Sequence, residues 1–199
     1  MAACWWFLGL AASPAVAADV TALIESCAGC HGADGVSTRA EMPSIAGLST
    51  PVHEDAWFTY QDKARPCATS KPVCDSCDAA AETDMCAIAA KLSEDEIVAI
   101  AEHFAELPFV AMKQDFDASK ASAGKAIHED ACAKCHSDGG SNPDDDAGIL
   151  AGQAKGYLER TFAQYAKGER DQPKKMKDKL DALSQDDVVA LVNYYASQQ

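Results

Sequence analysis

The sequence predicts an all-α protein made of two tandem domains that are related by an internal duplication. The motif Cys-x-x-Cys-His occurs twice, at 27–31 and 132–136, and the residues that follow each copy can be aligned. No segment shows the sustained alternation of apolar and polar residues that is typical of a strand. The 199 residues are sufficient for two small domains of about 90 residues each.

The duplication has two offsets. An offset of 105 residues relates the motifs and carries 45–47 (Ile-Ala-Gly) onto 150–152 (Leu-Ala-Gly). It also relates three side chains of the first half, Trp57, Tyr60 and Arg65, to Phe162, Tyr165 and Arg170. The closing segments 92–105 and 183–196 match at an offset of 91, so the first half holds 14 additional residues between Arg65 and the closing helix, the region that contains Cys67, Cys74, Cys77 and Cys86.

Each half is predicted to contain the same elements in the same order. A helix carries the motif near its end, and a loop, a short helix around Trp57 or Phe162, and a second loop follow. The closing helix begins with a capping signal, Ser93 with Glu96 or Ser184 with Asp187. Its apolar residues recur at helical spacing: Ile97, Ile100, Ala101 and Phe104 in one half, and Val188, Leu191, Val192 and Tyr195 in the other.

We expect residues 1–18 to be a secretory signal, because 1–17 are apolar, carry no charged side chain and end in Ala-Val-Ala. A membrane anchor is disfavoured because the run is too short to span a bilayer. The usual positive region is absent, which leaves open an upstream start codon or an unusually short signal. The mature chain would contain a first domain at 19–112, with its Cys-rich insertion at about 66–86, and a second at 113–199. A periplasmic location without a membrane span is expected.

The charge excludes some partners. The formal net charge is −14 and the pI is about 4.6, which argues against binding to nucleic acid or to an anionic membrane surface. Residues 19–112 carry a net charge of −11, whereas 113–199 carry −3. A basic cluster surrounds Met176 and is either a solvated loop or a surface that steers partners: Lys167, Arg170, Lys174, Lys175, Lys177 and Lys179.

Cys-x-x-Cys-His is the attachment signal for haem c. Cys27 and Cys30, and likewise Cys132 and Cys135, can add to the two vinyl groups of one haem, and the histidine that follows is directed at the iron. A chance pattern, a redox dithiol and half of a zinc site are the alternatives, which two copies in register disfavour. The segment from Cys74 to Cys77 is followed by Asp78, so it is not a third site. The predicted cofactors are two haem c groups.

The axial iron ligands follow from the repeat. His31 and His136 supply one side, and Met85 and Met176 are predicted on the other because each lies seven residues before the leucine that opens the closing segment. A thioether ligand raises the reduction potential. Because it also fills the sixth position, we expect electron transfer and not catalysis. Other methionines, Met42 and Met112, lack this support, and a core role is the alternative for any lone methionine.

Three further histidines and one proline carbonyl are also interpreted from their positions in the repeat. His53, His103 and His128 have no histidine counterpart in the other half and are predicted at the surface or at an interface. The Pro43 carbonyl is a candidate for orienting His31, although the second half has Gly148 at that position.

The four cysteines of the insertion are predicted to form two disulfides. Three pairings are possible, and a four-thiolate zinc site or a catalytic dithiol are the alternatives. Because Cys86 follows Met85, a disulfide there would restrain the loop that carries the axial ligand.

These features together resemble the dihaem cytochrome subunit of flavocytochrome c sulfide dehydrogenase, within the wider group of two-domain dihaem cytochromes c. The similarity is greatest over 123–199, in 124–125, 139–140, 149–153, 174–180 and 195–199. In the first half it is confined to 27–32, 43–46 and Met85 with the helix after it. The resemblance implies tandem cytochrome c-like domains, each around one covalent haem c. It also implies an FAD-binding partner subunit as electron donor and a soluble cytochrome as acceptor.

Two other functions remain open from the sequence. One is an independent dihaem shuttle between a respiratory complex and a terminal oxidase. The other is an enzyme that oxidises thiosulfate or reduces peroxide, which needs an open sixth position or a cysteine ligand. Cys67 and Cys86, unpaired as far as the sequence shows, keep that last alternative open.

Overall fold

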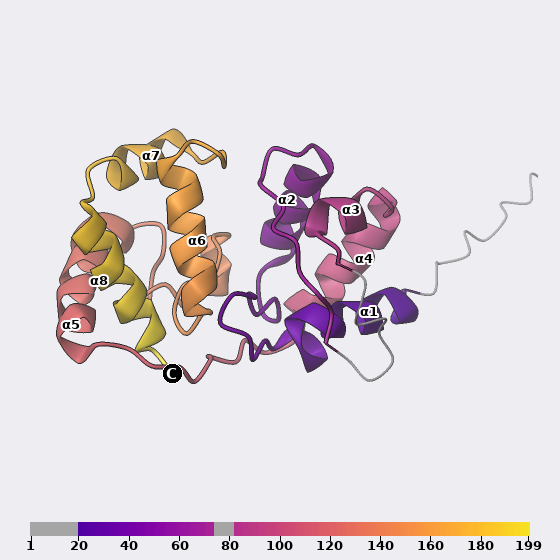
Figure 1. The fold of residues 1–199 in the computed structure, drawn as a ribbon, viewed down its shortest axis with the longest axis horizontal. Coiled ribbons are helices and arrows are strands. Elements are labelled where there is room, and N and C mark those ends of the chain that lie inside the picture. Colours follow the sequence, from indigo (N-terminus) through magenta and orange to yellow (C-terminus); the bar gives the residue numbers. More distant parts are fainter. Residues whose placement is uncertain (1–19, 74–81) are drawn as a thin grey trace, which may run out of the picture.

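The computed structural model describes residues 20–73 and 82–199 and shows two helical halves side by side (Figure 1). Within these ranges there is no strand, only one isolated antiparallel bridge between Ser70 and Thr83. None of the helices in the described part combines the length and apolar character needed to cross a bilayer. The expected signal at 1–18, as well as Cys74 and Cys77, lies outside the described residues. The all-α prediction is confirmed.

The first half begins with α1 (Thr21–His31), which carries the first motif at its end. A short 3-10 turn (Ala33–Gly35) and α2 (Thr50–Gln61) follow. The half closes with α3 (Met85–Ala89) and α4 (Glu94–Ala105). Trp57 lies on α2, as the sequence predicts.

The second half repeats this order. It contains α5 (Ala118–Ile127), a π-helical turn (His128–Cys132), a 3-10 turn (Pro143–Asp145), α6 (Lys155–Ala166), α7 (Lys174–Leu180) and α8 (Gln185–Ala196). The segment 106–117 joins the halves along the lower edge of the molecule in Figure 1.

Two details differ from the prediction. The second loop of each half is in part a short helix, α3 or α7, and each of these helices carries the predicted methionine. In α3, Asp84 caps the helix by accepting a hydrogen bond from the Ala87 amide. Helices of five and seven residues have too little periodicity to be recognised in a sequence.

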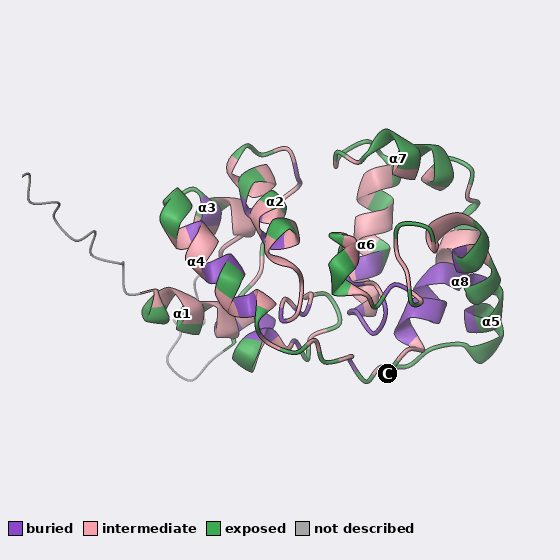
Figure 2. Ribbon diagram, turned by 180° about the vertical axis from the view of Figure 1, so that it is seen from behind, coloured by how far each residue is buried: buried purple, intermediate pink, exposed green. Residues whose placement is uncertain are grey.

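Each half has its own apolar core, and Figure 2 shows buried residues on the inward sides of the helices. In the first half, α2 packs on α4, and the core consists of Trp57, Ala89, Ile97, Ile100 and Phe104. In the second half, α5 and α6 both pack on α8, around Leu158, Leu191, Val192, Tyr194 and Tyr195. The closing helices supply most of each core, as their spacing predicts.

Both predicted capping signals are confirmed as reciprocal capping boxes. The Ser93 hydroxyl accepts from the Glu96 amide while the Glu96 carboxylate accepts from the Ser93 amide. Ser184 and Asp187 make the same pair of bonds at α8. Two otherwise unpaired amides are therefore satisfied at the start of each closing helix.

A cluster of tyrosines and arginines joins the two halves. Arg65 is buried, lies 4.5 Å from the centre of the Tyr60 ring and donates to the Tyr157 hydroxyl at 3.0 Å. Its repeat counterpart Arg170 lies over the ring of Tyr165. Burial raises the pKa of Tyr157, but Arg65 and Arg170 outweigh it and lower the pKa to about 7. The duplicated Tyr and Arg pairs therefore meet at the domain interface.

The crossing of α5 and α8 yields a testable prediction. A Cβ on Gly124 would lie 2.1 Å from the Ala190 carbonyl oxygen, so Gly124→Ala must push the two helices apart. We expect a loss of about 2 kcal/mol in the free energy of unfolding, measured by denaturant titration.

Gly148→Ala is the matched control, because a Cβ at Gly148 meets nothing within 4 Å. Equal stability of the two variants would show that the α5–α8 crossing does not require a glycine.

Candidate cofactor sites

The first motif lies at the end of α1, where the helix stops at Gly32. His31 is buried, and its Nδ1 lies 2.9 Å from the Pro43 carbonyl oxygen. Because a carbonyl only accepts hydrogen bonds, Nδ1 must carry the proton and donate it. The lone pair of the neutral imidazole is then on Nε2, which is the atom able to bind a metal.

The thiols of this motif are poorly suited to redox catalysis. Burial raises the pKa of Cys27 to about 11, and burial also raises the pKa of Cys30. Reactive dithiols need a lowered thiol pKa, because the thiolate is the nucleophile. The raised thiol pKa values therefore argue against a catalytic Cys-x-x-Cys at this motif.

The second motif begins at the last residue of the π-helical turn. Cys132 is half-buried, Cys135 is exposed and His136 is half-buried. Burial and the neighbouring His128 lower the pKa of His136, while Asp145 and a hydrogen bond to the Gly148 backbone oppose this. The Gly148 backbone thus lies beside His136, at the position that the repeat pairs with Pro43.

The donor set fits a covalently bound haem. The four motif cysteines form no disulfide in the described structure, so each half offers two thiols and, directly after them, a histidine. Two thiols one helical turn apart can reach the two vinyl groups along one edge of a porphyrin. A zinc site would need further thiolate or imidazole ligands at each motif.

The methionines occupy equivalent helices but different surroundings. Met85 opens α3 and packs on the first core, as Cys27 also does. Met176 is half-buried on α7, which contacts α6. In the described part of the chain Met176 is not among the side chains packed on the second core, although Cys132 is. The structure therefore brings Met85 and Cys27 to one apolar cluster, whereas it shows no such shared contact for Met176 and Cys132.

Two of the three histidines predicted at the surface or at an interface are instead buried against residues of their own half, Phe104 for His53 and Tyr195 for His128. His53 is 5% exposed and His128 is 1% exposed. The Nδ1 atom of His128 lies 3.0 Å from the Tyr195 hydroxyl, and the Nε2 atoms of both His128 and His53 are buried without a hydrogen-bond partner in the described structure. His103 is half-buried and packs edge-on against Phe104. A lone histidine has no sequence signal for burial, so only the packing reveals it.

The insertion contains a disulfide between Cys67 and Cys86. This is one bond of the three possible pairings, and it shows that neither cysteine is free, which corrects the interpretation that they look unpaired. The bond ties α3 at the residue after Met85 to the segment after Arg65. It therefore restrains the part of the chain that presents Met85.

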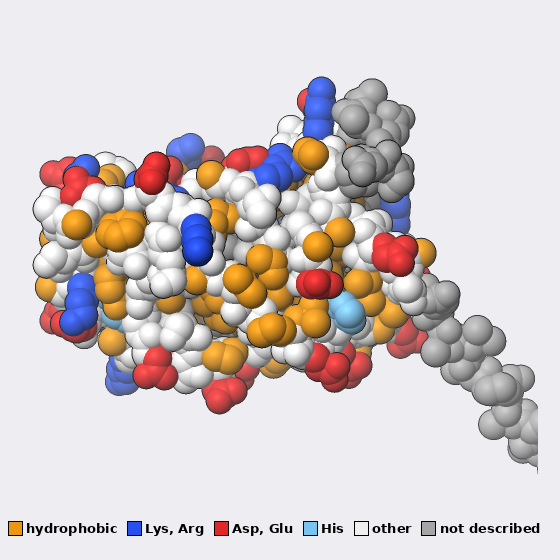
Figure 3. All heavy atoms as spheres, turned by 90° about the horizontal axis from the view of Figure 1, so that it is seen from below, with side chains coloured by type: hydrophobic (Ala, Val, Ile, Leu, Met, Phe, Trp, Pro, Cys, Tyr) orange, Lys and Arg blue, Asp and Glu red, His pale blue; other side chains and the backbone are white. Residues whose placement is uncertain are grey.

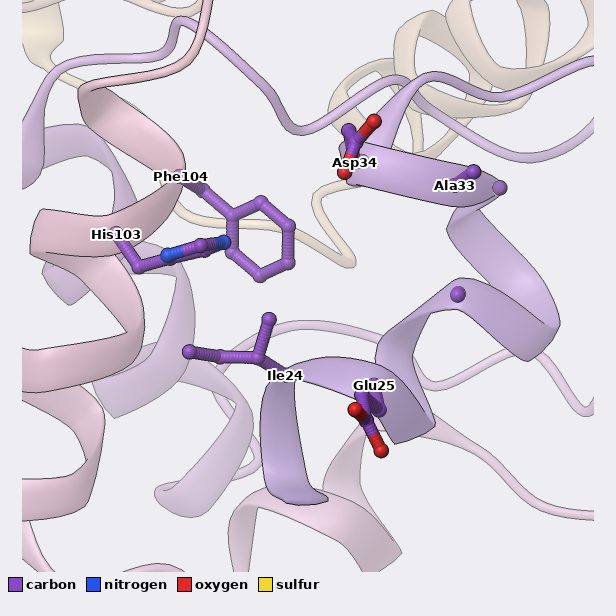
Figure 4. Close-up of a pocket in the computed structure, with 9 residues that line it drawn as sticks. Ile24, Glu25, Ala33, Asp34, His103 and Phe104 are labelled. Carbon is purple, nitrogen blue, oxygen red and sulfur yellow. The ribbon is translucent and has the colours of Figure 1, made fainter. Parts of the chain in front are cut away.

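Two hollows lie outside the motif cysteines and histidines. One of 240 Å³ lies between α1 and α4, where Ile24 and Phe104 point toward each other (Figure 4).

The other hollow, of 620 Å³, spans both halves and includes Pro108, Phe109 and Ile149 in its lining. Figure 3 views the molecule from below, along the face that the linker follows, and shows apolar side chains in the middle of that face with acidic side chains at its edges. The linings of both hollows lack the motif cysteines and histidines, although the first hollow includes Ala28 of the first motif and Gly32 directly after it.

The basic cluster around Met176 lies on and beside α7. Lys174, Lys175, Lys177 and Lys179 are exposed. Two of them pair along the helix, Lys174 with Asp178 and Lys177 with Asp181. Exposed pairs of this kind contribute little to stability, so the cluster is not explained by folding.

Residues 119–194 match the family described as cytochrome C oxidase, cbb3-type, subunit III. The fold is similar to reduced cytochrome c4 from Pseudomonas stutzeri, with 21% identity and a TM-score of 0.72 over 92% of this chain and 98% of that one. It is also similar to cytochrome c4 from Acidithiobacillus ferrooxidans, with 22% identity and a TM-score of 0.69 over 87% and 99%. No curated protein matched the sequence.

A thiosulfate dehydrogenase from Marichromatium purpuratum is also similar, with 26% identity and a TM-score of 0.68 over 87% of this chain. The chain spans only 36% of that protein. The fold therefore resembles that of cytochrome c4, with two cytochrome c-like domains in tandem, as the duplication predicts. The fold and the two motifs agree on haem c as the cofactor, one group in each domain. The sulfide dehydrogenase resemblance is supported only at the level of this wider group.

The disulfide yields a second testable prediction. Replacing Cys67 and Cys86 together by alanine removes a crosslink between residues 19 apart in sequence. We expect a loss of about 3 kcal/mol in the free energy of unfolding, because the unfolded chain gains conformational entropy. Denaturant unfolding of the variant and of the oxidised native protein measures the difference.

Peptide mapping without reduction supplies the control. It should recover the Cys67 peptide joined to the Cys86 peptide; recovery of either one joined to another cysteine would contradict the structure.

Proposed function

We propose that this protein is a periplasmic dihaem cytochrome c that carries electrons and does not itself transform a substrate. Cys27 and Cys30 anchor one haem, and Cys132 and Cys135 anchor the other. The axial ligands are His31 with Met85 in domain 19–112, and His136 with Met176 in domain 113–199. The observation that carries the proposal is the bond from His31 Nδ1 to the Pro43 carbonyl, which leaves Nε2 of a motif histidine free for iron.

The bound haem supplies reversible one-electron chemistry at iron, and the residues of the chain set its conditions. The motif histidine, with its proton held by a backbone carbonyl, is an electron-rich ligand of fixed orientation. The methionine thioether is neutral and favours ferrous iron. The apolar cores beside the motifs exclude water. A histidine and a methionine that both bound the iron would leave small molecules no access to the metal, which suits electron transfer.

The electron donor proposed is the FAD-binding subunit of a sulfide dehydrogenase, and the acceptor is a soluble cytochrome. The similarity of 123–199 to the dihaem subunit of that enzyme supports this assignment. The uneven charge supports it as well, since net charges of −11 and −3 let two partners approach different domains. The exposed lysines of α7 suit an acidic partner at the second domain.

A second candidate is an electron-accepting module for thiosulfate oxidation. The 26% identity with part of a thiosulfate dehydrogenase favours it. Catalysis by this chain alone is disfavoured, because Cys67 and Cys86 are joined to each other and cannot serve as an iron ligand. An independent shuttle is the third candidate, supported by alignment to nearly the full length of two cytochromes c4.

The ligand assignment predicts the effect of methionine variants. Met85→Leu and Met176→Leu should each remove about half of the near-infrared absorption that methionine bound to ferric haem produces, since each removes one of two thioether ligands. Each variant should also lower the reduction potential of one haem. Optical spectra and redox titration of the purified holoprotein measure both effects.

Met42→Leu is the matched control, because Met42 is also half-buried but is not a proposed ligand. An unchanged absorption band in Met176→Leu would refute that residue as a ligand without affecting the assignment of Met85.

The partner assignment is tested with native protein from the source cells. We expect this chain to be isolated with a stoichiometric flavoprotein, and we expect sulfide to reduce both haems only in that complex. Stopped-flow absorption at the haem bands records the reduction.

Haem reduction by thiosulfate in a flavin-free preparation would instead favour the second candidate. Stable isolation as a lone protein that is reduced only by respiratory donors would favour the shuttle.

A further inference from the structure

A glutamine of the second domain forms two hydrogen bonds with the main chain of the first domain. The Gln153 Oε1 atom accepts from the Ser44 amide at 2.8 Å, and the Gln153 Nε2 group donates to the Ser44 carbonyl at 2.9 Å. Gln153 is 2% exposed and Ser44 is completely buried. Oε1 also accepts from the Ala154 amide at 2.9 Å, which holds the side chain in place. This is a complete two-point contact across the domain interface, with no water between the partners.

Ser44, the residue that Gln153 binds, directly follows Pro43, whose carbonyl accepts the hydrogen bond from His31. The Ser44 N–H and the Pro43 C=O belong to one planar peptide group. On one side of that group its N–H donates to Gln153, and on the other side its oxygen accepts from His31 Nδ1 at 2.9 Å. One peptide unit therefore connects an amide of the second domain to the imidazole of the first domain.

The surrounding bonds fix the orientation of this peptide. The Ser44 hydroxyl accepts from the Ser37 amide at 3.1 Å, and Pro43 has a restricted φ angle. A peptide whose N–H donates strongly has a more negative carbonyl oxygen, because hydrogen bonds in a chain polarise one another. A stronger carbonyl acceptor makes the histidine a more electron-rich ligand.

We propose that Gln153 is a positioning residue that acts across the domain interface, holding the Pro43–Ser44 peptide against His31 and thereby lowering the reduction potential of the first haem. This inference rests on the proposed haem ligation by His31. Docking of the second domain is then part of what sets the redox properties of the first.

The repeat gives the first domain no residue that could make the equivalent contact with the second domain. The 105-residue offset places Leu48 where the second domain has Gln153, and Ile149 where the first has Ser44. A leucine side chain cannot hydrogen-bond a peptide. Leu48 of the first domain therefore cannot bind the main chain of Ile149 as Gln153 binds that of Ser44. The two haems therefore differ through a contact that only one of them receives, although the domains share one fold.

The test is Gln153→Met in the full-length holoprotein. Methionine has similar length and volume but forms neither hydrogen bond to Ser44. We expect the reduction potential of the first haem to shift upward while that of the second stays unchanged. Redox titration followed by NMR resolves the two haems, and the spectra of Met85→Leu and Met176→Leu assign them. We also expect faster solvent exchange of the His31 Nδ1 proton in the ferrous variant.

Gln198→Met is the matched control. Gln198 also donates a hydrogen bond to the main chain, to the Gly139 carbonyl at 2.7 Å, but this bond lies within the second domain and does not reach Ser44. Its replacement should leave the potential of the first haem and the exchange of the His31 proton unchanged.

The native protein supplies a measurement that requires no variant. The His31 Nδ1 proton should exchange more slowly than that of His136, and exchange at equal rates would count against the proposal. An unchanged first-haem potential in Gln153→Met, or an equal shift of both potentials, would overturn it. A preparation without covalent haem would instead refute the proposed function, so the two failures are distinguishable.

Discussion

The hydrogen bond between the His31 imidazole and the Pro43 carbonyl is the constraint on which the first site depends. A histidine at a helix end can rotate, and its two nitrogens can exchange roles unless one of them is committed. Because the Pro43 carbonyl only accepts, Nδ1 must be the hydrogen-bond donor, and Nε2 is left as the proposed ligand atom. The loop that contains Pro43 must therefore be held as firmly as the helix that contains His31. Gln153 supplies part of that hold from the other domain.

The two domains show how a duplicated scaffold can be made unequal. The helices, the capping boxes and the motif positions are shared. The differences lie in what surrounds them: a disulfide beside Met85, a lysine-rich helix around Met176, and a glutamine contact that reaches only the first domain. Each of these changes the surroundings of a proposed haem ligand while leaving the core intact. Two redox centres with different properties can arise in this way from one fold.

The interface between the domains uses buried polar groups. Arg65 stacks on Tyr60 and reaches Tyr157, and Gln153 pairs with Ser44. Buried hydrogen-bonding groups are costly when unpaired, so they favour one arrangement of the domains over others. For the proposed electron carrier with two haems this matters, because electron transfer depends on a reproducible separation between the centres. An interface held by apolar contacts alone would specify the arrangement less strictly.

The sequence by itself determined the helical class, the duplication, the closing helices with their capping boxes, and the two attachment motifs. These features are local, or repeat within the chain, so spacing alone reveals them. Only the tertiary structure decided that Cys67 pairs with Cys86, that His53 and His128 are buried, and that Gln153 reaches Ser44. Such contacts join residues as many as 109 positions apart, and a single sequence carries no period or motif that marks them. They depend on how the helices and domains pack, which is decided by the fold as a whole.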